Sequence, residues 1–267
     1  MPVLSAKQEK QQVYGFVIPN YNHHLVIEET IKALLSFELP IILVDDGSNE
    51  QTQQVLSAIE KEYHLVTLIR RAENGGKGAA VQSGLSAAIK AGWSHVLQVD
   101  ADGQHDLNDV TIMLEQSLEK PQTLISGQPI YDASISKGRY YGRFITHFWV
   151  HLETLSTDIK DSMCGFRVYP LAAYQQLITY SSLGNKMDFD IEVMVKLHWQ
   201  GVPMQFIATK VHYPKNGLSH FHVFDDNVLI SLMHSRLFFG MLIRLPKLLI
   251  RKITAKFKPS STDKALK

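Results

Sequence analysis

The strongest constraint on the fold is the alternation of short apolar runs with helical segments between residues 14 and 99. The apolar runs have the length of buried strands and cover residues 14–19, 40–44, 66–69 and 95–99. The intervening segments have helical spacing and cover residues 25–37, 52–63 and 78–91. This alternation predicts an α/β fold in which a mostly parallel sheet carries helices on both faces.

The second half of the chain is less regular. The expected elements there are strands at 124–127 and 205–211, and helices at 142–155, 187–200 and 226–258, the last interrupted at Pro246. The 267 residues fit one large domain with an extension. The predicted divisions are a polar N-terminal segment at 1–12, a domain at 13–225 and a basic amphipathic helical tail at 226–267.

Polar loops follow three of the four early strands, at residues 20–24, 45–48 and 100–106. Ligands of parallel sheets bind at the carboxyl ends of the strands, so these loops are expected to meet at one crevice. The sharpest signal is Asp100-Ala101-Asp102, where two carboxylates follow an apolar strand directly. Such a pair can bind Mg²⁺ or Mn²⁺ and thereby the diphosphate of a donor, although a solvated turn is the alternative.

Two further loops fit a nucleotide site. Asp46, in the sequence DDGS at 45–48, can accept hydrogen bonds from a base or ribose, although a turn and helix cap explain the same residues. The glycines of NGGKG at 74–78 allow a ligand close to the backbone, and the helix that follows attracts anions. This loop lacks the Walker A spacing, and the absence of G-x-G-x-x-G after the first strand argues against a Rossmann dehydrogenase.

The motifs occur in one order, PNYN at 19–22, DDGS at 45–48, NGGKG at 74–78 and DADGQH at 100–105. As a set they resemble the family 2 glycosyltransferases of the GT-A fold, especially the dolichyl- and polyprenyl-phosphate sugar transferases, over roughly residues 13–215. The resemblance implies metal-dependent, inverting transfer of a sugar from a UDP- or GDP-sugar. The acceptor would be a lipid or lipid-linked glycan in envelope polysaccharide or glycolipid synthesis, and the cofactor Mg²⁺ or Mn²⁺.

The resemblance also implies roles for single residues. Asp102 would be the main metal ligand, assisted by Asp100, and Gln104 would lie near the donor sugar or the metal. In CGFR at 164–167, which resembles the Ser-Gly-Phe-Arg element of these enzymes, Arg167 would face a phosphate. The residues expected to bind the donor are Pro19, Tyr21, Asp46, Asn74, Lys77, Asp100, Ala101, Gln104 and Arg167.

The acceptor side resembles the family more loosely. Asp190 is the first candidate for a general base and Asp188 the second, but a phosphate acceptor is already ionised and needs little base catalysis. The clear Glu-Asp pair of many members is absent. Arg139 and Arg143 would contact the acceptor or its phosphate; for them and for Arg167 a surface salt bridge is the alternative. His212 would be an extra metal ligand, or part of a polar loop over the site.

The charge is divided unevenly along the chain. Residues 1–226 contain 18 Lys+Arg and 25 Asp+Glu, a net charge of −7, whereas residues 227–267 contain 9 Lys+Arg and one acid, a net charge of +8. A basic tail predicts an anionic partner, and the acidic body argues against nucleic acid. Apolar residues flanked by cations at 237–249 fit an interfacial helix on an anionic membrane, although an ordinary packed helix fits as well.

No uninterrupted apolar run reaches the roughly 18 residues that span a bilayer, so no spanning helix is expected. The single cysteine, Cys164, suits a reducing compartment and a packed thiol. We therefore expect a cytoplasmic protein, peripheral on the inner face of the cytoplasmic membrane. Two other functions remain open. A nucleotidyltransferase uses similar carboxylates but usually opens with a Gly-rich basic loop, which residues 13–25 lack, and a non-catalytic nucleotide-sugar-binding or scaffold protein would differ only in turnover.

Overall fold

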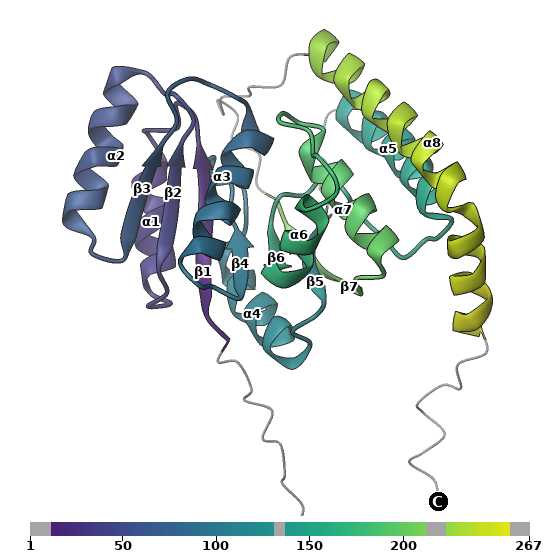
Figure 1. Cartoon of the computed structure of the whole chain (residues 1–267). Helices are drawn as coiled ribbons and strands as arrows, with labels where there is room; N and C mark the ends of the chain where they lie inside the picture. The colour runs from purple at the N-terminus through teal and green to yellow at the C-terminus, as the bar shows by residue number, and fades with distance from the viewer. Residues whose placement is uncertain (1–11, 131–136, 212–222, 257–267) are drawn as a thin grey trace, which may run out of the picture.

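A computed structural model of the chain describes residues 12–130, 137–211 and 223–256 (Figure 1). Its strands are β1 Tyr14–Asn20, β2 Ile41–Asp45, β3 Val66–Arg70, β4 His95–Gln98, β5 Leu124–Ile130, β6 Arg167–Pro170 and β7 Met204–Lys210. Its helices are α1 Ile27–Leu35, α2 Glu50–Glu62, α3 Lys77–Lys90, α4 Val110–Glu119, α5 Lys137–Thr154, α6 Leu171–Ile178, α7 Phe189–Gln200 and α8 Val223–Lys256, with a short 3₁₀ turn at Leu107–Asp109.

The strands form one seven-stranded sheet in the order β3-β2-β1-β4-β6-β5-β7. Strand β6 is antiparallel to both of its neighbours, and the other pairs are parallel. Every residue of β1 and β2 is buried, as expected for central strands covered on both faces. The prediction of a mostly parallel α/β sheet is therefore confirmed.

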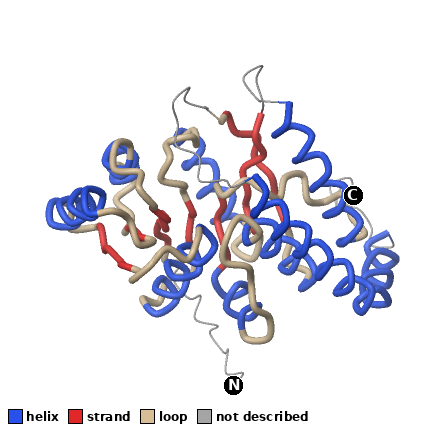
Figure 2. Tube along the Cα trace, turned by 90° about the horizontal axis from the view of Figure 1, so that it is seen from above, coloured by secondary structure: helices blue, strands red, loops and turns tan. Residues whose placement is uncertain are grey.

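Helices cover both faces of the sheet (Figure 2). Helices α1, α2 and α4 pack on one face, and α3, α6 and α7 pack on the other. Helix α3 lies close to β1 because its Gly84 has no side chain there: a Cβ atom at that position would come 2.4 Å from Val17 Cγ1. This close packing holds the first turn of α3 near the ends of the central strands.

Helices α5 and α8 run side by side outside α7 (Figure 1). Helix α8 continues through Pro246, so the expected interruption there is wrong. The helix instead changes direction along its length (Figure 1), which is the usual response to an internal proline that lacks an N–H. Its Met233, Leu237 and Met241 belong to the same buried core as the sheet, and the proposed domain boundary at residue 226 stays a prediction.

Length and composition make α8 a candidate membrane span over Phe224–Thr254, with a mean hydropathy of 1.5 and 28% of its window buried. This criterion uses length and composition alone, so the expectation of no spanning helix, which rested on uninterrupted runs, stays a prediction. Cations at Arg236, Arg244 and Lys247 interrupt the apolar run without removing its overall apolarity.

Candidate active site

The carboxyl ends of β2, β1 and β4 lie next to one another, since these strands are neighbours in the sheet. They end in Asp45, Asn20 and Gln98, and the backbone N–H of Asp46 donates to the carbonyl of Asn20 at 2.9 Å. The polar loops expected to form one crevice therefore follow adjacent strands.

Asp46 joins two of these loops. Its Oδ1 accepts a hydrogen bond from the Gly75 N–H at 3.1 Å and its Oδ2 one from the Gly76 N–H at 2.8 Å. Arg71 Nε lies 2.6 Å from the same carboxylate. At Gly47, φ is +70° and an added Cβ would come 2.6 Å from the backbone of Glu73, so only glycine allows the two loops to lie this close. Asp46 therefore fixes the glycine loop that begins α3.

Lys77, the first residue of α3, lies between two carboxylates. Its Nζ is 2.8 Å from Asp100 Oδ2 and 2.9 Å from Asp190 Oδ2. Burial would lower the pKa of the Lys77 ammonium, but the two carboxylates outweigh this effect and raise the pKa above its ordinary value. The triad of Lys77, Asp100 and Asp190 thus joins α3, the end of β4 and the first turn of α7 through a permanent cation.

Asp100 has further partners. Gln98 Nε2 donates to Asp100 Oδ1 at 3.2 Å, and His105 Nε2 lies 3.3 Å from Asp100 Oδ2 while its ring stacks on Phe166. Burial would raise the pKa of the Asp100 carboxyl, but Lys77 and His105 hold it below its usual range. Asp100 is therefore a carboxylate anchored on several sides.

Gly165 provides the space for this anchoring. A Cβ atom there would lie 2.7 Å from Lys77 Nζ and 2.8 Å from Asp100 Oδ2. The neighbouring Cys164 is buried, and burial raises the pKa of its thiol to about 12, which keeps it protonated and agrees with a packed thiol.

Arg167 is completely buried on β6, which is not the placement of a surface salt bridge. Its NH1 donates to the carbonyl of Asp190 at 2.6 Å and its NH2 to the carbonyl of Ser162 at 2.7 Å. Arg167 therefore holds the first turn of α7 in place, and its contact with a donor phosphate stays a prediction.

Asp188 lies outside the triad. Its Oδ1 accepts from the Lys186 N–H at 3.1 Å, and its Oδ2 is 3.7 Å from Arg236 of α8. Of the two candidate bases, only Asp190 is thus brought together with Lys77 and Asp100. This geometry distinguishes the candidates in a way that their spacing could not.

Arg143 of α5 forms an ion pair with the buried Asp161. Asp161 Oδ1 also accepts from the backbone N–H groups of Met163 at 2.9 Å and Cys164 at 2.8 Å. Burial would raise the pKa of Asp161, but His147 and Arg143 lower it. Arg143 therefore takes the salt-bridge role that the sequence left open, and its role toward an acceptor stays a prediction.

The remaining candidates are placed less closely. Pro19 is buried, Tyr21 and Gln104 are half-buried and Asn74 is exposed; Ala101 is buried. The Gln104 N–H donates to Asp102 Oδ1 at 3.1 Å, which fixes that loop. The side chain of Arg139 and all of His212 lie outside the described residues.

Four residues near the strand ends were not singled out from the sequence. Gln98, His105 and Asp161 act through the contacts above, and Asn20 is 1% exposed with no hydrogen-bond partner for its amide in the described part of the chain. A buried amide without partners is costly, which makes Asn20 a candidate ligand contact. Asn20 and His105 lie inside the motifs at 19–22 and 100–105, which was their available signal, whereas Gln98 and Asp161 lie outside the motifs.

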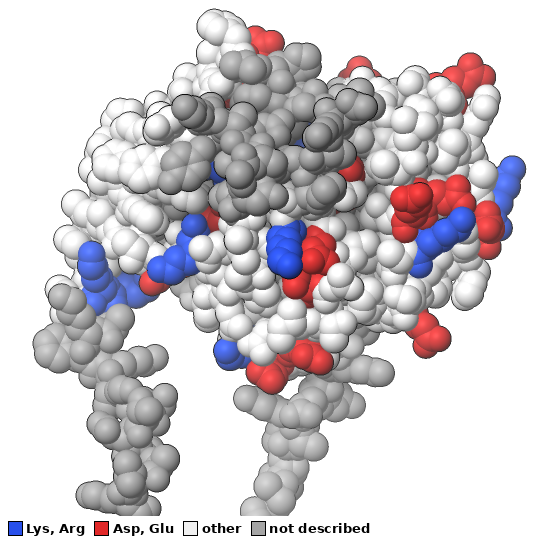
Figure 3. Space-filling view, turned by 180° about the vertical axis from the view of Figure 1, so that it is seen from behind, with Lys and Arg blue, Asp and Glu red and all other residues white. Residues whose placement is uncertain are grey.

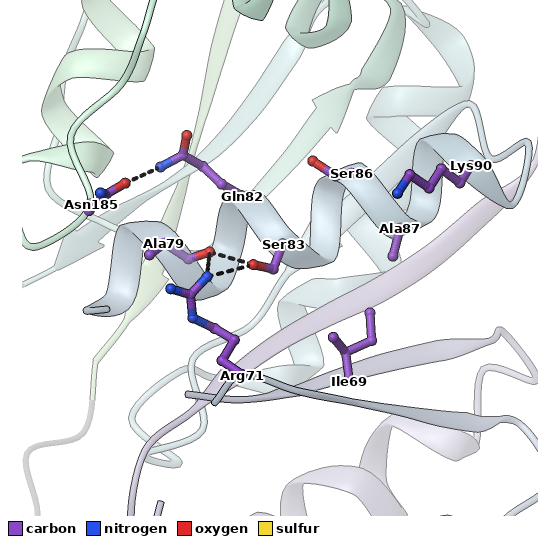
Figure 4. Close-up of a pocket in the computed structure, with 9 residues that line it drawn as sticks. All are labelled: Ile69, Arg71, Ala79, Gln82, Ser83, Ser86, Ala87, Lys90 and Asn185. Carbon is purple, nitrogen blue, oxygen red and sulfur yellow. Dashed lines mark hydrogen bonds between the residues drawn. The ribbon is translucent and has the colours of Figure 1, made fainter. Parts of the chain in front are cut away.

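A shallow hollow of about 580 Å³ lies between the end of β3 and the outer side of α3 (Figure 4). Arg71 crosses it and donates to the Ala79 carbonyl and to Ser83 Oγ, and Gln82 donates to Asn185. Its lining contains no carboxylate, and Arg71 reaches Asp46 from this side. The hollow therefore adjoins the site, but the chemistry lies at the strand ends.

The carboxylates of Asp100 and Asp102 fit a metal ion whose remaining ligands come from water and a bound substrate. Within the described ranges, no three His, Cys, Asp or Glu side chains form a group that could hold a metal alone. Asp100 is engaged by Lys77, whereas Asp102 follows it in the same loop and offers carboxylate oxygen, the ligand that Mg²⁺ and Mn²⁺ prefer. Mg²⁺ is commonly bound by one or two carboxylates with waters and substrate phosphates, which is the arrangement these residues can complete.

The chain resembles known proteins in both sequence and fold. The sequence model described as glycosyl transferase family 2 matches residues 16–178. A dolichyl-phosphate beta-glucosyltransferase of Trichomonas vaginalis, ALG5D, is 30% identical over 70% of this chain and 62% of its own length. The dolichyl-phosphate beta-glucosyltransferase of Dictyostelium discoideum is 26% identical over 72% of this chain and 64% of its own length. The chain thus spans a little under two thirds of these relatives.

Two solved structures share the fold. Glucosyl-3-phosphoglycerate synthase from Mycobacterium tuberculosis, in complex with Mn²⁺, UDP-Glc and phosphoglyceric acid, has a TM-score of 0.60 and 15% identity, covering 87% of this chain and 79% of that one. TarS of S. aureus in complex with UDP-GlcNAc has a TM-score of 0.56 and 14% identity, covering 86% of this chain and 72% of that one.

Proposed function

The chain belongs to glycosyl transferase family 2 and has the GT-A fold, and from this premise we propose that it transfers a sugar from a UDP-sugar to an isoprenoid lipid phosphate. The relatives named dolichyl-phosphate beta-glucosyltransferases support the lipid-phosphate acceptor. The UDP-sugars bound in the structural neighbours support the donor. The observation that carries the proposal is the triad of Lys77, Asp100 and Asp190 beside Asp102. Membership of this family removes the nucleotidyltransferase alternative.

The nucleoside of the donor would bind at the ends of β1 and β2, where Pro19, Tyr21 and Asp46 lie. Asp46 can contact the base or ribose while it holds the glycine loop, since a carboxylate has about four lone-pair sites. Asn74 and Lys77 would line the donor pocket from that loop, and Gln104 from the opposite one. The diphosphate would then lie at the end of β4.

A bound Mg²⁺ or Mn²⁺ would stabilise the negative charge that develops on the diphosphate as it leaves. Asp102 would hold this ion, with Asp100 beside it, and His212 would be an additional ligand. Lys77 contributes a second, fixed positive charge 2.8 Å from Asp100. Because Lys77 is held by two carboxylates, its charge is positioned before the donor binds.

In the transfer, an oxygen of the acceptor phosphate forms a bond to the anomeric carbon. The bond from that carbon to the donor diphosphate breaks, and the diphosphate leaves with the bonding electrons. An ionised phosphate needs little base catalysis, so the role proposed for Asp190 is mainly to orient Lys77, with proton removal important only for a hydroxyl acceptor. Arg139 and Arg143 would face the acceptor phosphate, and attack from the opposite side would invert the anomeric centre.

The first test is calorimetric titration of UDP and GDP into the purified protein, with and without Mn²⁺, for wild type and Asp102→Ala. We expect metal-dependent binding of UDP that the substitution removes. Radiolabelled UDP-glucose and dolichyl phosphate in detergent would then give labelled lipid. Binding without turnover of any UDP-sugar would support the non-catalytic alternative, and failure of the folded protein to bind either nucleotide would refute the donor site.

The proposed place of action is the cytoplasmic face of a membrane, where a lipid phosphate and a cytoplasmic UDP-sugar meet. The basic, partly exposed α8 supports this, because its outer side carries apolar residues and the last described part of the helix carries cations. An anionic membrane surface is the proposed partner.

A further inference from the structure

Helix α5 carries an exposed stripe of large apolar side chains. Tyr141, Phe144, Ile145 and Phe148 are spaced as one face of a helix, and they are 62%, 69%, 59% and 60% exposed. The opposite side of the same helix is buried at Thr146 and Val150. Four large exposed side chains on one face form an apolar patch of the kind that marks an interaction surface.

Helix α8 has the same two-sided character. Ile230, Met233, Leu237 and Met241 are buried against the domain. Residues on other sides of the helix are exposed, among them Phe239 at 64%, Leu242 at 45%, Ile243 at 80%, Ile250 at 61% and Ile253 at 57%.

A row of aromatic rings joins the two patches. Between ring centroids, Phe148 is 5.9 Å from Trp149, and Trp149 is 6.3 Å from Phe238 of α8. The ring centroid of Phe238 is in turn 5.9 Å from that of Phe239. The buried Glu153–His234 contact, 2.8 Å between Oε1 and Nδ1, fixes the same two helices to each other. The apolar surface is therefore continuous from α5 to α8.

Cations predominate on α8, which has no acid after Asp226. Lys247 and Lys252 are exposed, whereas Arg236 lies 3.7 Å from Asp188 and 4.0 Å from Glu192. Arg244 lies over the Trp199 ring, 4.7 Å from its centroid, and Arg251 donates to the His198 carbonyl at 2.6 Å, so these two cations reach toward α7. In Figure 3 the side that carries α5 and α8 is largely uncharged, and basic side chains gather at its lower end.

We propose that α5 and α8 together form one docking surface for an anionic lipid bilayer, lying in its interface, with α5 as the part nearest the active site. The inference rests on the proposed function, and it extends membrane contact from the tail to a helix of the catalytic domain. An apolar face with a cationic border is the composition that binds the boundary between acyl chains and anionic headgroups.

The packing of α8 favours an interfacial position over a spanning one. To cross the bilayer, α8 would have to leave the domain, exposing the buried side that includes Met233 and Leu237 and separating His234 from Glu153. The exposed side needs no such rearrangement to contact lipid.

Helix α5 also connects this surface to the catalytic residues. Arg143 pairs with Asp161, and Asp161 binds the backbone of Cys164. The next residue, Gly165, lies against Lys77 and Asp100. A bilayer seated on α5 would therefore be held within a few residue contacts of the donor site, as a lipid acceptor requires.

The test is co-flotation with liposomes of phosphatidylcholine and phosphatidylglycerol, using the full chain. The variant Phe144→Ser/Phe148→Ser is compared with Phe239→Ser/Ile243→Ser on α8 and with the control Ile112→Ser/Leu118→Ser on α4, whose residues are 39% and 54% exposed. We expect the α5 and α8 variants each to lose about tenfold or more in liposome affinity, and the control to bind like wild type.

Equal liposome binding by the α5 variant and the wild type would overturn the proposal. Resistance of the wild-type protein to extraction from membranes by alkaline carbonate would also overturn it, because such resistance indicates a spanning helix. If the α5 variant fails to fold, Ile145→Cys labelled with an environment-sensitive dye replaces it, since the native Cys164 is buried. A blue shift on liposomes, absent from labelled Leu118→Cys, supports contact; no shift overturns it. UDP titration separates the two proposals, because the α5 variant should keep wild-type UDP affinity, whereas absent UDP binding in wild type would refute the proposed function alone.

Discussion

Replacing Lys77 by methionine tests the triad most directly. The substitution keeps the aliphatic stem but leaves Asp100 and Asp190 without their shared cation, 2.8 and 2.9 Å away. Removing one partner of a buried ion pair costs about 3–5 kcal/mol. The side chains of Lys77 and Asp100 are 19% and 18% exposed, and solvent screening reduces the expected loss of unfolding free energy to about 2–4 kcal/mol.

A loss of this size lowers Tm by about 4–7 °C in a protein of this length. Differential scanning calorimetry measures the shift, and Lys90→Met, an exposed lysine on the same helix, is the matched control with an expected change near zero. Metal-dependent UDP affinity should fall in Lys77→Met alone. A Tm and a UDP affinity equal to those of Lys90→Met would refute the view that Lys77 positions the two carboxylates.

The pH dependence gives an independent check. The pKa of Asp100 is lowered in the folded protein, so its contribution is present above its ordinary value of 3.8 and is lost as the pH falls through the folded value. The pKa of Lys77 is raised, so its contribution is present below its ordinary value of 10.5 and is lost only as the pH rises through the folded value. The destabilisation by Lys77→Met should therefore be constant from about pH 5 to pH 9 and shrink below about pH 4.

Three further substitutions test other parts of the structure. Gly165→Ala places a methyl group 2.7–2.8 Å from polar atoms of the triad and should weaken metal-dependent UDP binding by about tenfold or more in calorimetry, with Gly142→Ala, where nothing lies within 4 Å, as the control. Glu153→Ala leaves the buried His234 unpaired and should cost about 2 kcal/mol in urea unfolding and weaken liposome binding; an unchanged unfolding midpoint would contradict the proposed link between α5 and α8. Asp161→Asn should cost about 2–4 kcal/mol at pH 7, and because the folded pKa of Asp161 is lowered, the difference from wild type should disappear in acid; a constant difference down to about pH 2 would refute this.

The sequence was sufficient for the elements whose signals are local. The continuous apolar runs identified strands β1, β2 and β4 to within one residue at their ends. Strands that are buried on both faces are apolar at nearly every position, so their local sequence is enough to identify them. Strand β6 was missed because it is four residues long and begins with a charged residue, Arg167. Arg167 can be buried there because its guanidinium donates hydrogen bonds to the carbonyls of Asp190 and Ser162. Those partners belong to other segments of the chain.

The site shows the same division between local and tertiary information. Motif order placed Asp46, Lys77 and Asp100 on the donor side, and the structure places them at or beside the carboxyl ends of adjacent strands. The spacing between Asp188 and Asp190 could not say which of them meets Lys77, because that depends on how α7 packs against α3. The close contact of Gly78 with Phe189, where a Cβ would come 2.5 Å from the Phe189 Cβ, sets that packing.

The apolar stripe of α5 shows why periodicity alone could not locate the proposed docking surface. Spacing of i, i+3, i+4 and i+7 predicts an apolar helix face, and in most helices that face is buried in the core. Here Tyr141, Phe144, Ile145 and Phe148 point outward, because Arg143 and Glu153 occupy the side that faces the domain, through Asp161 and His234. The tertiary contacts of α5 thus leave its apolar stripe as the exposed face, which is the face proposed to contact a bilayer.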